Sequence, residues 1–112
     1  MERTITPDAL KARLADRANL LLLDVRRRTD LDADTDALPN AEWRDPDNVE
    51  EWSRTLPKDK PVVLYCSRGG SVSNRVLDRL LEQNLPAQYL EGGIAAWKSA
   101  GNKTVPKPSP GK

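Results

Sequence analysis

The chain has 112 residues, of which 38% are hydrophobic and 31% are charged, so we expect a single domain with its own core. Its 18 basic and 17 acidic side chains leave a net charge of +1, which excludes a general attraction to nucleic acid or to an anionic membrane. One cysteine and no histidine exclude an internal disulfide, a cysteine-based zinc site, a Cys-His dyad and a Ser-His-Asp triad, so any nucleophile must be activated by backbone dipoles, arginine or lysine.

The first two predicted elements are a helix and a buried strand. Residues 7–16 read as a short amphipathic helix, with Thr6 as N-cap and Pro7 at the first helical position. Residues 20–25 form an unbroken apolar run, as expected for a strand buried on both faces of a parallel sheet. Neither segment resembles a secretory or membrane-spanning sequence, so a cytoplasmic location is expected.

The middle of the chain has weaker signals. Residues 26–36 are charged and show no periodicity, which predicts a loop. Residues 39–41 begin a turn and a minor strand. Residues 48–56 are interpreted as a helix that presents Val49 and Trp52.

The second half alternates strands and helices. Residues 61–66 are the strongest strand, residues 67–71 a tight loop, and residues 72–83 a helix with an apolar inner face. A strand at 87–90 and a helix at 94–100 follow. This alternation predicts an α/β domain over residues 1–102, whose parallel sheet is flanked by helices on both faces. Residues 103–112 are rich in proline and lysine and are expected to be a disordered tail.

Cys66 is the candidate nucleophile. It ends a predicted buried strand, and ligands of open parallel sheets bind beyond the carboxyl ends of the strands. The glycine pairs 69–70 and 92–93 each follow a strand, where they allow several N–H groups to point at one anion. Together with the start of the next helix, such a nest would stabilise a thiolate. An inert buried cysteine would have no use for this loop.

Four motifs resemble, in order and spacing, those of the rhodanese family: LDVR at 23–26, LPNA at 38–41, VVLYC at 62–66 and LEGGIAAW at 90–97. The resemblance implies a five-stranded parallel sheet flanked by helices on both faces, a cysteine persulfide intermediate, and neither metal nor organic cofactor. Three departures stand out: Ala37 replaces a frequent histidine, Asn40 replaces a glycine, and Ser71-Val72 replaces the arginine-serine pair that commonly closes the loop. The stretch WRDP at 43–46 also resembles rhodanese proteins linked to bacterial chromate resistance.

The resemblance also implies the reaction. The thiolate attacks the outer sulfur of thiosulfate or a related donor, sulfite leaves, and the persulfide passes to cyanide or a thiol. A protein persulfide, a mercaptopyruvate-like thiol acid or a glutathione persulfide would fit as donors. Arg68 would favour an anionic donor, and Ser71 would hydrogen-bond the terminal sulfur. The expected loop consists of the nucleophile Cys66 and the substrate-binding Ser67, Arg68, Gly69, Gly70 and Ser71.

Several readings compete with this one. Asp24 and Arg26 are expected to tie loops together near the site, as supporting residues. A cysteine phosphatase or arsenate reductase needs the loop C-x5-R, and Val72 occupies the position of that arginine. A non-catalytic rhodanese-like module that binds a partner or senses a small molecule is the other alternative. The oligomeric state is left open.

Overall fold

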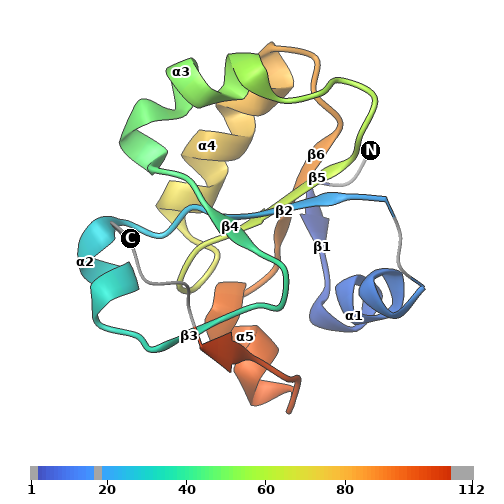
Figure 1. Cartoon of the computed structure of the whole chain (residues 1–112), viewed down its shortest axis with the longest axis vertical. Helices are drawn as coiled ribbons and strands as arrows, with labels where there is room; N and C mark the ends of the chain where they lie inside the picture. The colour runs from blue at the N-terminus through green and yellow to red at the C-terminus, as the bar shows by residue number, and fades with distance from the viewer. Residues whose placement is uncertain (1–2, 17–18, 107–112) are drawn as a thin grey trace.

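A five-stranded sheet organises the chain. The computed structural model describes residues 3–16 and 19–106. All neighbouring strands of this sheet run parallel, which confirms the predicted α/β class (Figure 1). Their order across the sheet is β1 (Thr4–Ile5), β6 (Ala87–Leu90), β5 (Val62–Tyr65), β2 (Leu21–Asp24) and β4 (Glu42–Trp43).

Helices cover both faces, and each face has its own apolar cluster. The helices are α1 (Pro7–Ala15), α3 (Val49–Trp52), α4 (Ser71–Glu82) and α5 (Gly93–Ser99), with short 3-10 turns at Pro46–Asn48 and Ser53–Thr55. On one face, α3 and α4 pack against Leu23, Val62 and Leu64. On the other, α1 and α5 pack against Leu22 and Val63. Successive residues of β2 and β5 therefore alternate between the two clusters, as the strand period of two requires.

The start of α1 follows the sequence prediction in detail. The Thr6 side chain accepts a hydrogen bond from the Ala9 N–H at 3.1 Å, and Pro7 opens the helix. The buried Leu10 then fixes the helix to the sheet. Among the described residues, no helix is both long and apolar enough to cross a bilayer.

The structure corrects the predicted loop over residues 26–36. Within it, Arg28–Asp32 form a helix, α2, with Leu31 buried beneath it. Asp36–Ala37 then form β3, which pairs antiparallel with β7 at Val105–Pro106.

The start of the expected tail also differs from the prediction. Lys103 contributes a backbone carbonyl that accepts a hydrogen bond from the Trp97 indole N–H at 2.8 Å, and β7 follows directly. Residues 103–106 are thus held against the domain by the Trp97 side chain and by the pairing of β7 with β3. Residues 107–112, the rest of the expected tail, lie outside the described residues.

Candidate active site

Cys66 lies directly after β5, near the centre of the sheet's carboxyl edge. Its side chain is buried, and its Sγ accepts a hydrogen bond from the Gly69 N–H at 3.2 Å. Residues 66–71, the thiol loop, turn the chain from β5 into α4, which begins at Ser71. The first N–H groups of a helix have no intrahelical partner, so the start of α4 offers donors near the thiol.

The thiol loop is held from below by the start of α5. The N–H groups of Ile94 and Ala95 donate to the carbonyls of Cys66 and Ser67 at 2.9 and 3.0 Å. Gly93 makes this approach possible, because a Cβ built there would lie 2.4 Å from the Cys66 carbonyl oxygen. Its φ of +62° also disfavours any residue with a side chain.

The two glycine pairs meet in space. A Cβ at Gly69 would lie 2.8 Å from the backbone nitrogen of Gly92, and Gly69 has a φ of +71°. The pairs noticed in the sequence therefore form one close backbone contact between the thiol loop and the turn before α5. That contact fixes the loop without using side chains.

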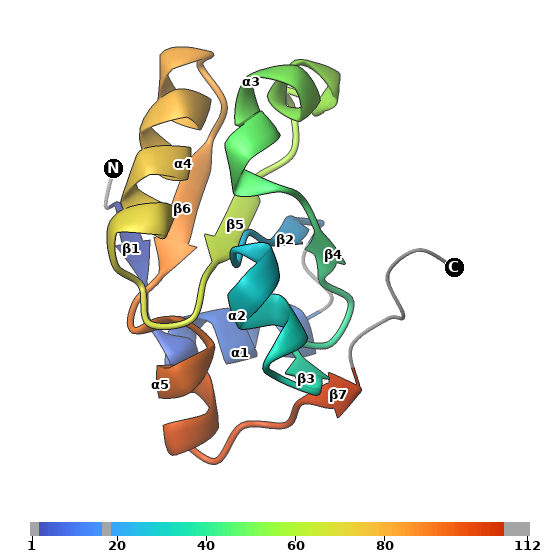
Figure 2. The ribbon, with the colours of Figure 1, turned by 90° about the vertical axis from the view of Figure 1, so that its left-hand side faces the viewer.

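A pocket of about 310 Å³ opens beside the thiol. The thiol loop forms one side of the pocket with Ser67, Arg68, Gly70 and Ser71, all predicted from the sequence. The fifth predicted residue, Gly69, donates its N–H to the sulfur. The opposite side comes from α2 and the residue before it, which lie next to the thiol loop in Figure 2. The full lining is Arg27, Asp30, Cys66, Ser67, Arg68, Gly70, Ser71 and Val72.

Sequence reasoning missed the pocket residues Arg27 and Asp30. Both were assigned to an irregular charged loop, and a five-residue helix carries too little periodicity to be recognised. The run of three arginines at 26–28 was the one available signal. Val72 lines the pocket as an apolar side chain, at the position where a phosphatase loop requires arginine.

Asp24 and Arg26 form a buried ion pair beside the site. Arg26 is 1% exposed, and its Nη2 donates to Asp24 Oδ2 at 2.7 Å while its Nε contacts both carboxylate oxygens. The guanidinium also donates to Asp34 Oδ2 at 3.1 Å and to the Asp36 carbonyl at 3.0 Å. Burial alone would favour the neutral form, but the hydrogen bonds and charge of Asp24 raise the pKa of Arg26.

Tyr65 closes this network from β5. Its hydroxyl donates to Asp24 Oδ2 at 3.1 Å and accepts from the Leu38 N–H at 3.2 Å. Burial, followed by the charge of Asp24, raises the pKa of Tyr65. Neither Asp24 nor Arg26 lines the thiol pocket; they lie at and just after the end of β2, the strand that pairs with β5. Their supporting role stays a prediction.

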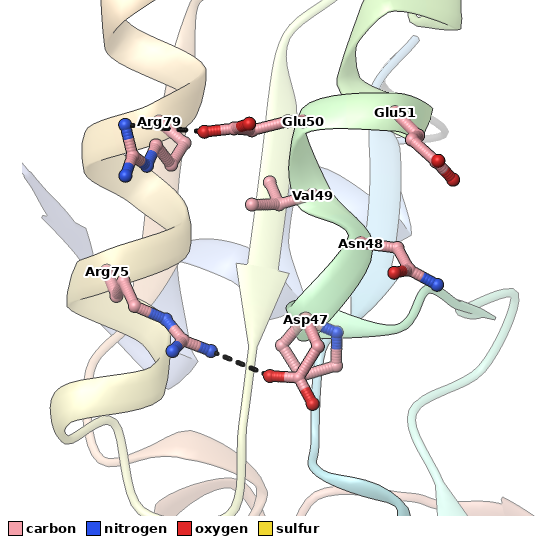
Figure 3. A pocket seen from close by; sticks show the side chains of 8 residues that line it. Asp47, Asn48, Val49, Glu50, Glu51, Arg75 and Arg79 are labelled. Atoms are coloured by element: carbon pink, nitrogen blue, oxygen red, sulfur yellow. Dashed lines mark hydrogen bonds and ion pairs between the residues drawn. The ribbon is translucent and has the colours of Figure 1, made fainter.

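A second hollow, of about 400 Å³, lies between α3 and α4. Its arginines are already paired: Arg75 Nη2 lies 3.3 Å from Asp47 Oδ1, and Arg79 Nη1 lies 3.6 Å from Glu50 Oε1 (Figure 3). No nucleophile lines this hollow. The described residues also contain no group of three or more His, Cys, Asp or Glu side chains that could hold a metal ion.

Comparisons with known proteins agree with this geometry. The family model described as a rhodanese-like domain matches residues 6–100. A sulfurtransferase of Allochromatium vinosum is 32% identical over 102 residues, which cover 90% of this chain and 92% of the relative. A thiosulfate sulfurtransferase of Coxiella burnetii is 33% identical over 87 residues, covering 77% of this chain and 78% of the relative.

A solved structure agrees as well. The rhodanese-like domain protein of Staphylococcus aureus superimposes with a TM-score of 0.79 at 25% identity. The alignment covers 96% of this chain and all of that protein.

Proposed function

The chain belongs to the rhodanese-like family, and from this premise we propose that it is a sulfurtransferase that carries sulfur as a persulfide on Cys66. The donor is thiosulfate or a related sulfane sulfur compound, and the acceptor is cyanide or a thiol. The thiosulfate assignment is supported by the name of the Coxiella relative. The observation that carries the proposal is the buried thiol at the mouth of a pocket whose backbone N–H already contacts the sulfur.

The first half-reaction places an extra sulfur on Cys66. The thiolate electron pair attacks the outer sulfur of thiosulfate, the S–S bond of the donor breaks, and its electron pair leaves with sulfite. The persulfide sulfur then lies where the donor was bound, among the Ser71 hydroxyl and the first N–H groups of α4. These donors stabilise its negative charge, and no further cofactor is required for the electron count.

Arg68 acts on the donor before the bond forms. Its side chain lines the pocket and has no acidic partner within the described part of the chain. A free guanidinium at the rim attracts a dianion and orients its sulfonate oxygens. Ser67 and Gly70 complete the rim from the same loop.

A phosphatase reading is disfavoured by Val72. Phosphoryl transfer in such loops uses a guanidinium that clamps the transferring group, and an apolar side chain lines the pocket there. A non-catalytic module would retain the fold but would form no covalent adduct. The three readings therefore differ in what becomes attached to Cys66.

The test is a thiosulfate:cyanide sulfurtransferase assay of the wild-type protein and Cys66→Ser. We expect turnover in the wild type and none above background in the variant, with unchanged far-UV circular dichroism, because serine is a poor nucleophile without a base. Residual turnover close to the wild-type rate in the folded variant would contradict the assignment of Cys66.

A further inference from the structure

Three consecutive arginines after β2 have different surroundings. Arg26 is buried in its ion-pair network, and Arg28 Nε lies 3.5 Å from Asp32 Oδ1. Arg27 is exposed and lines the pocket beside Cys66. Its guanidinium has no acidic partner within the described part of the chain.

Asp30 is the matching anion. It lies three positions after Arg27, is exposed, and lines the same pocket. Arg27 is the N-cap of α2, with extended backbone, and Asp30 is the third residue of that helix. Among the described residues Asp30 has no cationic partner, Arg27 included. The pocket wall therefore presents one unpaired cation and one unpaired anion to whatever enters.

This wall suits a guest with charges of both signs. A guanidinium binds a carboxylate through two parallel hydrogen bonds, and a carboxylate accepts hydrogen bonds from an ammonium group. A guest with only negative charge would be attracted by Arg27 and repelled by Asp30, so the wall penalises it relative to a zwitterion. On the opposite side of the pocket, Arg68 of the thiol loop already provides a positive charge for the donor dianion.

We infer that Arg27 and Asp30 select the sulfur acceptor, and that the preferred acceptor is a small thiol carrying both a carboxylate and an ammonium group, as in cysteine. The inference rests on the proposed sulfur transfer. Arg27 binds the acceptor carboxylate, Asp30 binds its ammonium, and the thiol between them reaches the persulfide of Cys66.

The transfer step balances without another reactant. The acceptor thiol first loses its proton to solvent. The thiolate electron pair then attacks the terminal sulfur of the Cys66 persulfide, and a new S–S bond forms. The S–S bond to Cys66 breaks, its electron pair stays on Sγ, and the free thiolate returns. The acceptor leaves as a persulfide.

The experiment compares three acceptors on protein loaded with thiosulfate and desalted. Cysteine carries both charges, 3-mercaptopropionate only the carboxylate, and cysteamine only the ammonium. Loss of the added sulfur is timed by intact-mass measurement. Each acceptor is compared with itself across variants, so differences in thiol reactivity cancel.

Two variants should distinguish the contribution of Asp30 from that of Arg27. Asp30→Asn should slow transfer to cysteine and cysteamine by about tenfold, as expected for one lost charge-assisted contact, without slowing 3-mercaptopropionate. Arg27→Gln should slow cysteine and 3-mercaptopropionate by a similar factor without slowing cysteamine. Each variant is first loaded with excess thiosulfate until intact mass shows the same added sulfur as in the wild type, so only the acceptor step is compared.

Arg28 and Asp32 of α2 provide matched controls, because neither residue lines the pocket. Asp32→Asn and Arg28→Gln make the same charge changes away from the pocket and should leave all three rate constants unchanged. If Asp30→Asn slows all three acceptors alike or none of them, or if Asp32→Asn matches its effect, the inference is overturned. A wild-type protein that never acquires sulfur would instead overturn the proposed function, and the inference with it.

Discussion

Two segments leave the carboxyl edge of the sheet from neighbouring strands, and they are held in different ways. The thiol loop after β5 is held by backbone: two loop carbonyls accept from the start of α5, and Gly93 permits the approach. The segment after β2 is held by side chains, with Arg26 donating to Asp24, Asp34 and the Asp36 carbonyl.

The contrast bears on which of the two segments we propose to carry the reacting thiol. In the network after β2, the guanidinium of Arg26 and the hydroxyl of Tyr65 donate to Asp24, so these two groups are not free to bind a ligand. In the thiol loop, the carbonyls face α5 while Sγ and the side chain of Arg68 face the pocket. We therefore expect the thiol loop to carry the reacting sulfur, while the Asp24–Arg26 pair fixes the backbone after β2.

The largest expected effect is a loss of stability when the buried Asp24–Arg26 ion pair is broken. Arg26→Met leaves the Asp24 carboxylate buried without its main partner, which should lower the free energy of unfolding by about 3–5 kcal/mol. Urea denaturation followed by circular dichroism measures it. The double variant Asp24→Asn, Arg26→Met removes the stranded charge and should be less destabilised than the sum of the single changes. A loss below about 1 kcal/mol in Arg26→Met would mean that the network contributes little to the frame.

The next largest expected effect is a loss of activity when the thiol loop is displaced. Gly93→Ala places a Cβ against the Cys66 carbonyl and should displace the thiol loop, lowering sulfurtransferase kcat/KM by about a hundredfold. Gly101→Ala is the matched control, because it has a similar φ of +77° but no atom within 4 Å of the added Cβ. It carries the backbone strain alone and should keep its activity. Equal activity of the two variants would contradict the tight backbone contact.

The smallest effect concerns the outer edge of the network and depends on pH. Although burial alone would raise it, the hydrogen bond from Lys98 and the charge of Arg26 lower the pKa of Asp34. Because the folded-state pKa lies below the ordinary value of about 3.9, this stabilisation is present above about pH 4 and is lost as pH falls further. Asp34→Asn should therefore be less stable than wild type by about 1 kcal/mol at neutral pH.

Urea denaturation of Asp34→Asn and wild type at a series of pH values tests this. The difference in free energy of unfolding between wild type and Asp34→Asn should disappear as the pH is lowered through the folded-state pKa of Asp34. If this difference in free energy of unfolding stays the same in strongly acidic solution, the lower stability of Asp34→Asn comes from packing and not from the charge of Asp34.

Sequence reasoning predicted what local patterns encode. The apolar runs of β2 and β5, the cap of α1 and the glycines around Cys66 are each visible within a few residues. The pocket residues that this reasoning missed come from a segment distant in sequence from Cys66. Arg27 and Asp30 reach the thiol because β2 and β5 are neighbours in the sheet, which no local pattern states.

Other features were also missed, some of them because they too depend on contacts between segments that are distant in the sequence. β1 has two residues, too few for an alternating pattern, and β3 pairs with β7 across most of the chain length. The burial of Arg26 was also unexpected, because arginine is rarely buried unless it is paired. Its partners Asp34 and Asp36 lie in a stretch without periodicity.

The central claim is that Cys66 carries sulfur between two separate steps, and intact-mass measurement tests it most directly. Wild-type protein incubated with excess thiosulfate and rapidly desalted should gain the mass of one sulfur atom. Cyanide should then remove it, and Cys66→Ser should never acquire it. A wild-type mass that stays unchanged with thiosulfate and with alternative persulfide donors would contradict sulfur transfer and favour a non-catalytic binding module.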